Sequence, residues 1–112
     1  MQWRQRSGLP LTVKRYKITL MIRSFRCKDT QALFETGKAR RWSSLKAVAE
    51  RKLIQLHAAE KLSDLKAPPG NRLEALAGDR EGEHSIRIND QWRLCFRWTP
   101  DGPEGVEIVD YH

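Results

Sequence analysis

The chain has 112 residues, of which 39% are hydrophobic and 31% charged, and this balance is typical of one small globular domain and excludes a disordered chain. No stretch approaches the roughly 18 apolar residues that a membrane-spanning helix requires, so we expect no membrane partner. The formal net charge of +7 favours a polyanion, most commonly nucleic acid, as a partner.

The excess positive charge is concentrated in residues 1–20, which contain five basic residues and no acidic residue. Residues 21–112 contain the other 16 basic and all 14 acidic residues. Lys14, Arg15 and Lys17 interrupt the apolar stretch that an export signal needs, so we expect a cytoplasmic protein. Because Met21 opens a segment that looks like a protein start, we expect residues 1–20 to be a basic extension or an early start, and residues 21–112 to be the domain. The alternative is a basic arm that adds to the first strand.

The first half of the domain is predicted to contain one strand and two helices. Residues 20–26 have the pattern of a strand. Residues 30–36 are predicted to form a short helix with Asp29 as N-cap and Gly37 as its stop. A longer helix is predicted over residues 44–61, with Ser43 as N-cap. Apolar residues recur there at intervals of three and four, namely Leu45, Val48, Ala49, Leu53, Leu56 and Ala59.

The second half changes to the period of two that is typical of strands. Apolar and polar residues alternate over residues 84–88 and again over residues 92–98, separated by the turn residues Asn89 and Asp90. A turn rich in glycine and proline follows over residues 99–105, and residues 106–111 are predicted to be the last strand. Short turns make these three strands antiparallel. The sequence therefore predicts an α+β fold in the order β-α-α-β-β-β, with two helices packed on one face of an antiparallel sheet.

The alternation predicts a cluster of arginines on the face of the sheet that the helices leave open. If the apolar residues of both strands face the helices, then Arg87, Arg93 and Arg97 point the other way. A guanidinium suits a phosphate because it keeps its charge and offers a planar fork of donors. The alternative interpretation is an ordinary solvated sheet face.

The C-terminal residues Asp110, Tyr111 and His112 form a second candidate site. His112 can exchange a proton near neutral pH, Tyr111 can contact a phosphate or stack on a base, and Asp110 can orient the imidazole. In a regular strand Asp110 and His112 share one face and Tyr111 takes the other. The alternative is a frayed polar chain end.

A third candidate segment precedes the sheet, at residues 72–82. Gly78 and Gly82 permit a tight loop there, and Arg80 can reach a phosphate. The glycines do not match a P-loop, because no Gly-Lys-Ser/Thr follows them. The alternative is a plain connection with solvated charges.

The sequence predicts no metal site and no cofactor. Cys27 and Cys95 belong to no CxxC pair, and the three histidines lack metal-ligand spacing with either cysteine. His57 lies beside the apolar stripe of the long helix, where we expect a half-buried structural histidine.

A set of segments extends in order over residues 21–112. They are Met21-Ile22-Arg23-Ser24-Phe25-Arg26, Leu33-Phe34-Glu35-Thr36-Gly37, Arg72-Leu73 with Leu76 and Gly78-Asp79-Arg80, Ser85-Ile86-Arg87-Ile88-Asn89, Trp92-Arg93-Leu94 with Phe96, and Asp110-Tyr111-His112. In their order and spacing, these segments together resemble the HigB toxins, also called plasmid-maintenance killer proteins, of the RelE/ParE superfamily.

The resemblance implies a RelE-like fold and an endoribonuclease that cleaves mRNA on the translating ribosome. The implied partner is a HigA-like antitoxin with a helix-turn-helix domain, which blocks the toxin and carries the complex to operator DNA. Asp110, Tyr111 and His112 match the catalytic ending of the family, and Arg93 matches its phosphate-binding arginine. Many relatives have a histidine where this chain has Glu74 and a lysine where it has Ala77. Glu74 can replace the histidine as base, and Arg80 and Arg87 can replace the missing charge.

These residues predict a metal-independent reaction, because RNA carries its own nucleophile in the 2′-hydroxyl. The reaction then needs a base, an acid and cations for the phosphate. Two alternatives remain. One is a ParE-like inhibitor of DNA gyrase with the same fold, and the other is a non-enzymatic RNA-binding domain that uses the arginines and residues 1–20.

Overall fold

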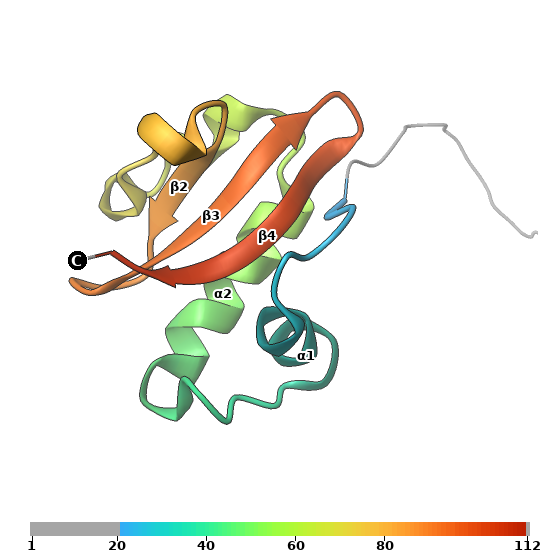
Figure 1. Ribbon diagram of the computed structural model, residues 1–112, viewed down its shortest axis with the longest axis vertical. Helices are drawn as coiled ribbons and strands as arrows, with labels where there is room; N and C mark the ends of the chain where they lie inside the picture. The colour runs from blue at the N-terminus through green and yellow to red at the C-terminus, as the bar shows by residue number, and fades with distance from the viewer. Residues whose placement is uncertain (1–20, 112) are drawn as a thin grey trace, which may run out of the picture.

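The computed structural model describes residues 21–111 (Figure 1). The expectations for residues 1–20 and for the candidate residue His112 lie outside the described residues. Between residues 21 and 111 the chain forms two α-helices followed by a sheet of four strands, with short 3₁₀ turns between them. This arrangement confirms the predicted α+β class.

The first helix, α1 (Lys28–Thr36), ends as predicted but begins differently. Gly37 adopts a left-handed φ of 77° and its N–H donates to the carbonyl of Leu33, which closes the helix. The predicted N-cap was wrong, because α1 starts before Asp29 and Cys27 occupies the cap position. Asp29 lies in the first turn, where its charge suits the helix dipole, and it forms an ion pair with Arg41.

The second helix, α2 (Lys46–Ala58), is shorter than predicted at both ends. A 3₁₀ turn over Ser43–Leu45 precedes it, so Ser43 is not its N-cap, and Ala59 adopts an extended backbone that ends it. The predicted apolar stripe is confirmed. Its buried members are Leu45, Ala49, Leu53, Leu56 and Ala59, and Val48 is partly buried.

The sheet has the spatial order β1-β2-β3-β4 and every pair is antiparallel. Its strands are β1 (Glu74–Ala75), β2 (His84–Arg87), β3 (Trp92–Thr99) and β4 (Gly102–Asp110). The last hairpin turns within Pro100 and Asp101, so β4 begins four residues earlier than the sequence predicted. The short β1 was not predicted, because its two residues carry no alternation.

The strand predicted over residues 20–26 is reduced to a single parallel bridge. Phe25 pairs with Val106 of β4, and Arg26 N donates to the Val106 carbonyl while Val106 N donates to the Ser24 carbonyl. The segment therefore runs beside β4 without a regular ladder. Its contribution to the sheet depends on a partner some eighty residues away, which a local pattern cannot reveal.

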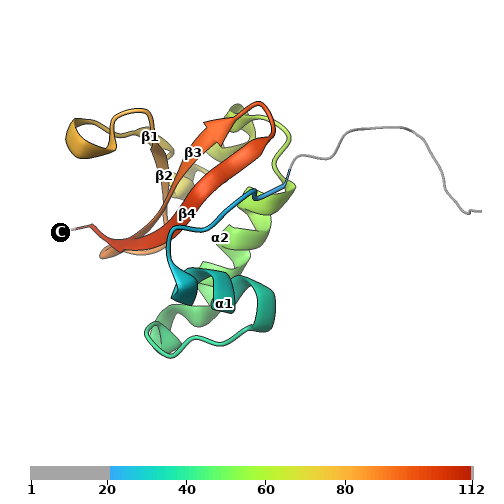
Figure 2. The ribbon, with the colours of Figure 1, turned by 45° about the vertical axis from the view of Figure 1, so that its right-hand side comes forward.

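The helices pack against one face of the sheet and form the core with it. Figure 2 shows α1 and α2 on the same side of β3 and β4. The strand residues that the helices cover are Ile86, Leu94, Phe96, Val106 and Ile108, all of them buried. The predicted direction of the alternation is thus confirmed, and the opposite face is left for Arg93 and its neighbours.

Substituting Gly102 is expected to destabilise the fold. Gly102 has φ 124°, and a Cβ there would lie 2.3 Å from the backbone oxygen of Met21. Gly102→Ala should lower the free energy of unfolding by about 2–3 kcal/mol, from backbone strain and the forced displacement of the first segment. Urea denaturation of Gly102→Ala and of the matched control Gly70→Ala, which meets nothing within 4 Å, checks this. Equal stability of the two variants would contradict the expectation.

None of the helices between residues 21 and 111 is long and apolar enough to cross a membrane.

Candidate functional site

The open face of the sheet carries Arg93 at its centre. Ser85 and Arg93 lie there with Cys95, and all three are buried although no helix covers them. The segment that leads into β2 lies beside them, because the Arg72 carbonyl accepts a hydrogen bond from Arg93 and because Leu76, Ala77 and Arg80 line a hollow together with Cys95. The predicted direction of Arg93 is therefore confirmed. The third candidate segment, residues 72–82, lies next to Arg93 on the open face of the sheet.

The Arg93 guanidinium is held rigidly from two sides. Its Nε donates to the Ser85 hydroxyl at 2.7 Å, and its Nη2 donates to the carbonyls of Arg72 at 2.6 Å and Ser85 at 3.3 Å. The side chain is 7% exposed. A cation fixed in this way needs little reorganisation when it meets an anion, and burial strengthens the attraction.

Glu74 and Tyr111 complete a three-residue cluster with Arg93, which we call the Arg93 cluster. The Glu74 carboxylate lies 3.5 Å from Nη2 of Arg93 and accepts a hydrogen bond from the Tyr111 hydroxyl at 3.2 Å. The Arg93 guanidinium lies 5.1 Å from the centre of the Tyr111 ring. The structure therefore brings together one residue from each of three candidate groups: the loop, the arginine face and the C-terminus.

A hollow of about 260 Å³ opens over one side of the Arg93 cluster. Arg72, Arg87, Arg93 and Tyr111 line it, together with Asn89 and Asp90. Arg87 forms an ion pair with Asp90, whose side chain is almost fully exposed. An exposed ion pair of this kind contributes little to stability, so an incoming phosphate can compete with Asp90 for the guanidinium.

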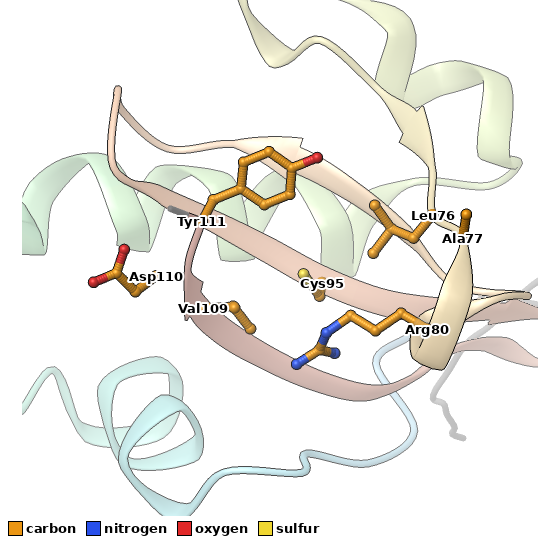
Figure 3. A pocket seen from close by; sticks show the side chains of 7 residues that line it. All are labelled: Leu76, Ala77, Arg80, Cys95, Val109, Asp110 and Tyr111. Atoms are coloured by element: carbon orange, nitrogen blue, oxygen red, sulfur yellow. The ribbon is translucent and has the colours of Figure 1, made fainter.

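A second hollow, of about 390 Å³, lies on the other side of Tyr111 (Figure 3). Arg80 lines it and is bound through Nη1 to Glu83 at 3.0 Å and through Nη2 to Glu107 at 3.2 Å. Burial opposes the charge of Arg80, but the hydrogen bonds with Glu107 and Glu83 raise the pKa of the guanidinium, so it stays a cation. Arg26 also pairs with both carboxylates.

Cys95 forms part of the floor of the second hollow. Burial raises the pKa of its thiol to about 11, with the neighbouring carboxylates Glu83 and Glu107 adding to the effect of burial against Arg80. The thiol is therefore neutral at physiological pH, where it acts as a small apolar group and not as a nucleophile.

The remaining candidates lie further from the Arg93 cluster. Asp110 is exposed and accepts a hydrogen bond from the Gln91 side chain at 3.0 Å, and Figure 3 shows its carboxylate turned away from Tyr111. Arg97 is exposed and donates to the Gly82 carbonyl. It follows Arg93 by four residues along β3, or roughly 13 Å of strand. His57 is half-buried, accepts a hydrogen bond from the backbone of Ile22 and packs on Phe34, as predicted.

Sequence reasoning placed Arg72 in a candidate segment without giving it a role, and it gave no role to Ser85 or Glu83. Arg72 adopts a left-handed φ of 47° after a turn that the buried Asn71 side chain anchors to the carbonyls of Leu65 and Ala67. A Pro-Pro-Gly-Asn sequence is typical of a turn, but it does not show that the carbonyl after the turn binds Arg93. Ser85 and Glu83 are buried polar residues in or next to β2. Their sequence pattern does not show that they bind Arg93 and Arg80, because these contacts depend on how the strands pair.

The site combines fixed cations, a carboxylate and an aromatic hydroxyl. Arg72, Arg87 and Arg93 converge on one hollow and can neutralise a phosphate, while Glu74 can accept a proton beside it. Among residues 21–111 no group of three or more metal-ligating side chains gathers.

Comparison with known proteins gives consistent matches over nearly the whole described chain. A family model described as the RelE-like toxin of type II toxin-antitoxin system HigB matches residues 23–112. Toxin HigB-1 of Vibrio cholerae serotype O1 is 41% identical over 93 residues, which cover 81% of this chain and 94% of that protein. Endoribonuclease HigB of Proteus vulgaris is 30% identical over 96 residues, which cover 82% of this chain and all of that protein.

Proposed function

The chain belongs to the HigB family of RelE-like toxins of type II toxin–antitoxin systems, and on this basis we propose that it is a metal-independent endoribonuclease that cleaves mRNA on the translating ribosome. The name of the Proteus vulgaris relative supports the endoribonuclease activity. The observation that carries the proposal is the Arg93 cluster, in which a buried guanidinium stands beside a carboxylate and an aromatic hydroxyl under an open, cationic hollow.

The proposed reaction uses the 2′-hydroxyl of the RNA as nucleophile. Its oxygen forms a bond to the adjacent phosphorus while the bond from phosphorus to the 5′-oxygen breaks. The products are a 2′,3′-cyclic phosphate and a 5′-hydroxyl. Arg93 and Arg87 bind the phosphate, and the rigid bonds of Arg93 place its charge before the reaction starts.

The proton transfers are assigned to the chain end and to the loop. The base takes the proton of the 2′-hydroxyl, and we assign His112 to give a proton to the leaving 5′-oxygen. Contact with phosphate or base is assigned to Tyr111, and orientation of the imidazole to Asp110. Glu74 is assigned as the base that replaces the histidine of many relatives, because its carboxylate stands beside both Arg93 and Tyr111. Arg80 and Arg97 are assigned to further contacts along the RNA.

As a type II toxin, the protein has an antitoxin as its partner. We propose that this antitoxin is HigA-like, with a helix-turn-helix domain, and that the toxin reaches operator DNA only through it. The ribosome and mRNA are the proposed targets. We place these events in the cytoplasm, where translation occurs.

The proposal is tested by adding the full chain to a reconstituted translation system with a defined mRNA. Cleavage within codons is expected with ribosomes present, and none with the mRNA alone. A parallel supercoiling assay with purified DNA gyrase should show no inhibition. Inhibition of gyrase with intact mRNA would replace the proposal by the ParE-like function.

Removing residues 1–20 separates the proposal from a non-enzymatic RNA-binding domain. We propose that residues 21–112 carry the activity, so the shortened chain should cleave mRNA as the full chain does. A non-enzymatic RNA-binding domain that relies on the basic residues 1–20 would instead lose its affinity for RNA when they are removed. RNA binding by the full chain would then weaken steeply as the salt concentration rises, and neither form would cleave mRNA.

A further inference from the structure

We propose that Asn71 is a positioning residue for the cleavage reaction, which holds the Arg72 carbonyl in place and, through it, the guanidinium of Arg93. This inference rests on the proposed ribonuclease function and adds to it a residue that acts from outside the phosphate site. Asn71 is fully buried and lines neither of the two hollows beside Tyr111. Any effect of Asn71 on cleavage must therefore pass through its neighbours.

The backbone of Arg72 has a conformation that its surroundings must impose. Within residues 21–111, Arg72 is the one residue other than glycine with a positive φ, which is 47°. A residue with a Cβ disfavours this region, and backbone strain of this kind is often found at functional sites. The carbonyl of Arg72 accepts a hydrogen bond from Nη2 of Arg93 at 2.6 Å. The unfavourable backbone therefore coincides with a contact that fixes Arg93.

The buried amide of Asn71 imposes this conformation on the residue that follows it. Its Nδ2 donates to the carbonyls of Leu65 at 3.0 Å and Ala67 at 3.2 Å, and to the Gln55 side chain at 3.2 Å. Its Oδ1 accepts a hydrogen bond from Nζ of Lys52 at 2.5 Å. Lys52 and Gln55 belong to α2, so the amide ties the turn to a helix of the core. Because rotating the turn would leave buried polar groups without partners, the turn is held in one conformation.

The Arg72 carbonyl sets the direction of the Arg93 guanidinium. The Ser85 hydroxyl holds Nε, but a guanidinium held at that atom alone can still swing about it. The bond from Nη2 to the Arg72 carbonyl, with a longer one to the Ser85 carbonyl, removes this freedom. A displacement of about 1 Å at a reacting centre can cost about 10²-fold in rate, so movement of the Arg72 carbonyl should slow cleavage.

The first arm of the test compares mRNA cleavage by the full chain and by its Asn71→Asp variant. Aspartate has the same shape and keeps an acceptor for Lys52, but its second oxygen cannot donate to the carbonyls of Leu65 and Ala67. The maximal rate should fall by about 10–10²-fold, while the half-saturating concentration of ribosomal complexes should change by less than about threefold. Leu33→Val, which lowers stability by removing one methylene from the buried face of α1, is the control and should keep the original rate.

A double-mutant cycle with Arg93→Ala separates positioning from a general effect on the fold. Because Asn71 acts through Arg93, adding Asn71→Asp to Arg93→Ala should slow cleavage by less than about twofold further. The same factor in both backgrounds would overturn the inference. Gln55→Leu, which removes one partner of the Asn71 amide, covers the case in which Asn71→Asp does not fold. It should slow cleavage by about threefold, and the original rate in Gln55→Leu would then overturn the inference.

The second arm does not depend on cleavage. NMR of the ¹⁵N-labelled guanidinium measures how fast the Arg93 group rotates about the bond between Nε and Cζ. Rotation should be about tenfold faster in Asn71→Asp than in Leu33→Val, the effect of losing one well-placed hydrogen bond. Equal rotation, or equal rates of cleavage by these two variants, would overturn the inference and leave the ribonuclease function standing. If the full chain cleaves no mRNA, the ribonuclease function fails, and the rotation alone decides whether Asn71 positions Arg93.

Discussion

Arg93→Ala is expected to lower the single-turnover rate of mRNA cleavage by about 10²–10³-fold, the cost of removing one preorganised charge donor from a reacting centre. Arg93 is the deepest of the three arginines that line the phosphate hollow, and its Nε and Nη2 bonds to Ser85 and Arg72 fix its position. Arg93→Lys should lose nearly as much, because an ammonium cannot reproduce the forked contacts.

The loss in Arg93→Ala must be separated from damage to the fold. The substitution leaves the Ser85 hydroxyl and the Glu74 carboxylate without their cation, so we expect some loss of stability. Thermal unfolding of each variant therefore accompanies the kinetics. Arg40→Ala removes an exposed arginine between the two helices and should leave both rate and stability unchanged. A folded Arg93→Ala protein that cleaves mRNA at the rate of Arg40→Ala would show that Arg93 takes no part in the reaction.

Glu74→Gln is expected to lower the rate constant of cleavage by about 10²-fold and to leave the half-saturating concentration of ribosomal complexes unchanged or lower. Glutamine keeps an acceptor for the Tyr111 hydroxyl but cannot take a proton at neutral pH. It also removes the negative charge beside Arg93, which frees the guanidinium for the phosphate. Slower chemistry with undiminished binding is therefore the signature of a base.

Glu74→His is the matched comparison, since it introduces the residue type that the resemblance to the family leads us to expect there. It should cleave within about tenfold of the original chain, because a positioned imidazole is also a base. If Glu74→Gln were as fast as the original chain, Glu74 would be a structural partner of Arg93 only. If Glu74→His were as slow as Glu74→Gln, the position would not supply the base.

The direction of the sheet residues could be predicted because it depends on local periodicity. Alternation over β2 and β3 placed Ile86, Leu94 and Phe96 toward the helices and Arg93 away from them, and the structure agrees. The end of α1 at Gly37 could also be predicted from the local sequence, because glycine readily adopts the left-handed φ that closes a helix.

Contacts that depend on register between distant segments could not be predicted. Glu74 and Tyr111 are 37 residues apart, and β2 and β3 separate β1 from β4. Their side chains meet because the Tyr111 ring lies against the Arg93 guanidinium, which also contacts Glu74. The first segment pairs with Val106 at one bridge, which no local pattern marks. The helix starts were wrong for a related reason, because Cys27 and Leu45 hold the cap positions where side-chain chemistry favours Asp29 and Ser43.

The most direct test of the account is mRNA cleavage in a reconstituted translation system by the full chain and by its His112→Ala variant, with the new RNA ends identified. The account predicts ribosome-dependent cuts by the full chain that leave a 2′,3′-cyclic phosphate and a 5′-hydroxyl, slowed by about 10²–10⁴-fold in the folded variant. Intact mRNA with the full chain, or cleavage at the same rate by His112→Ala, would contradict it.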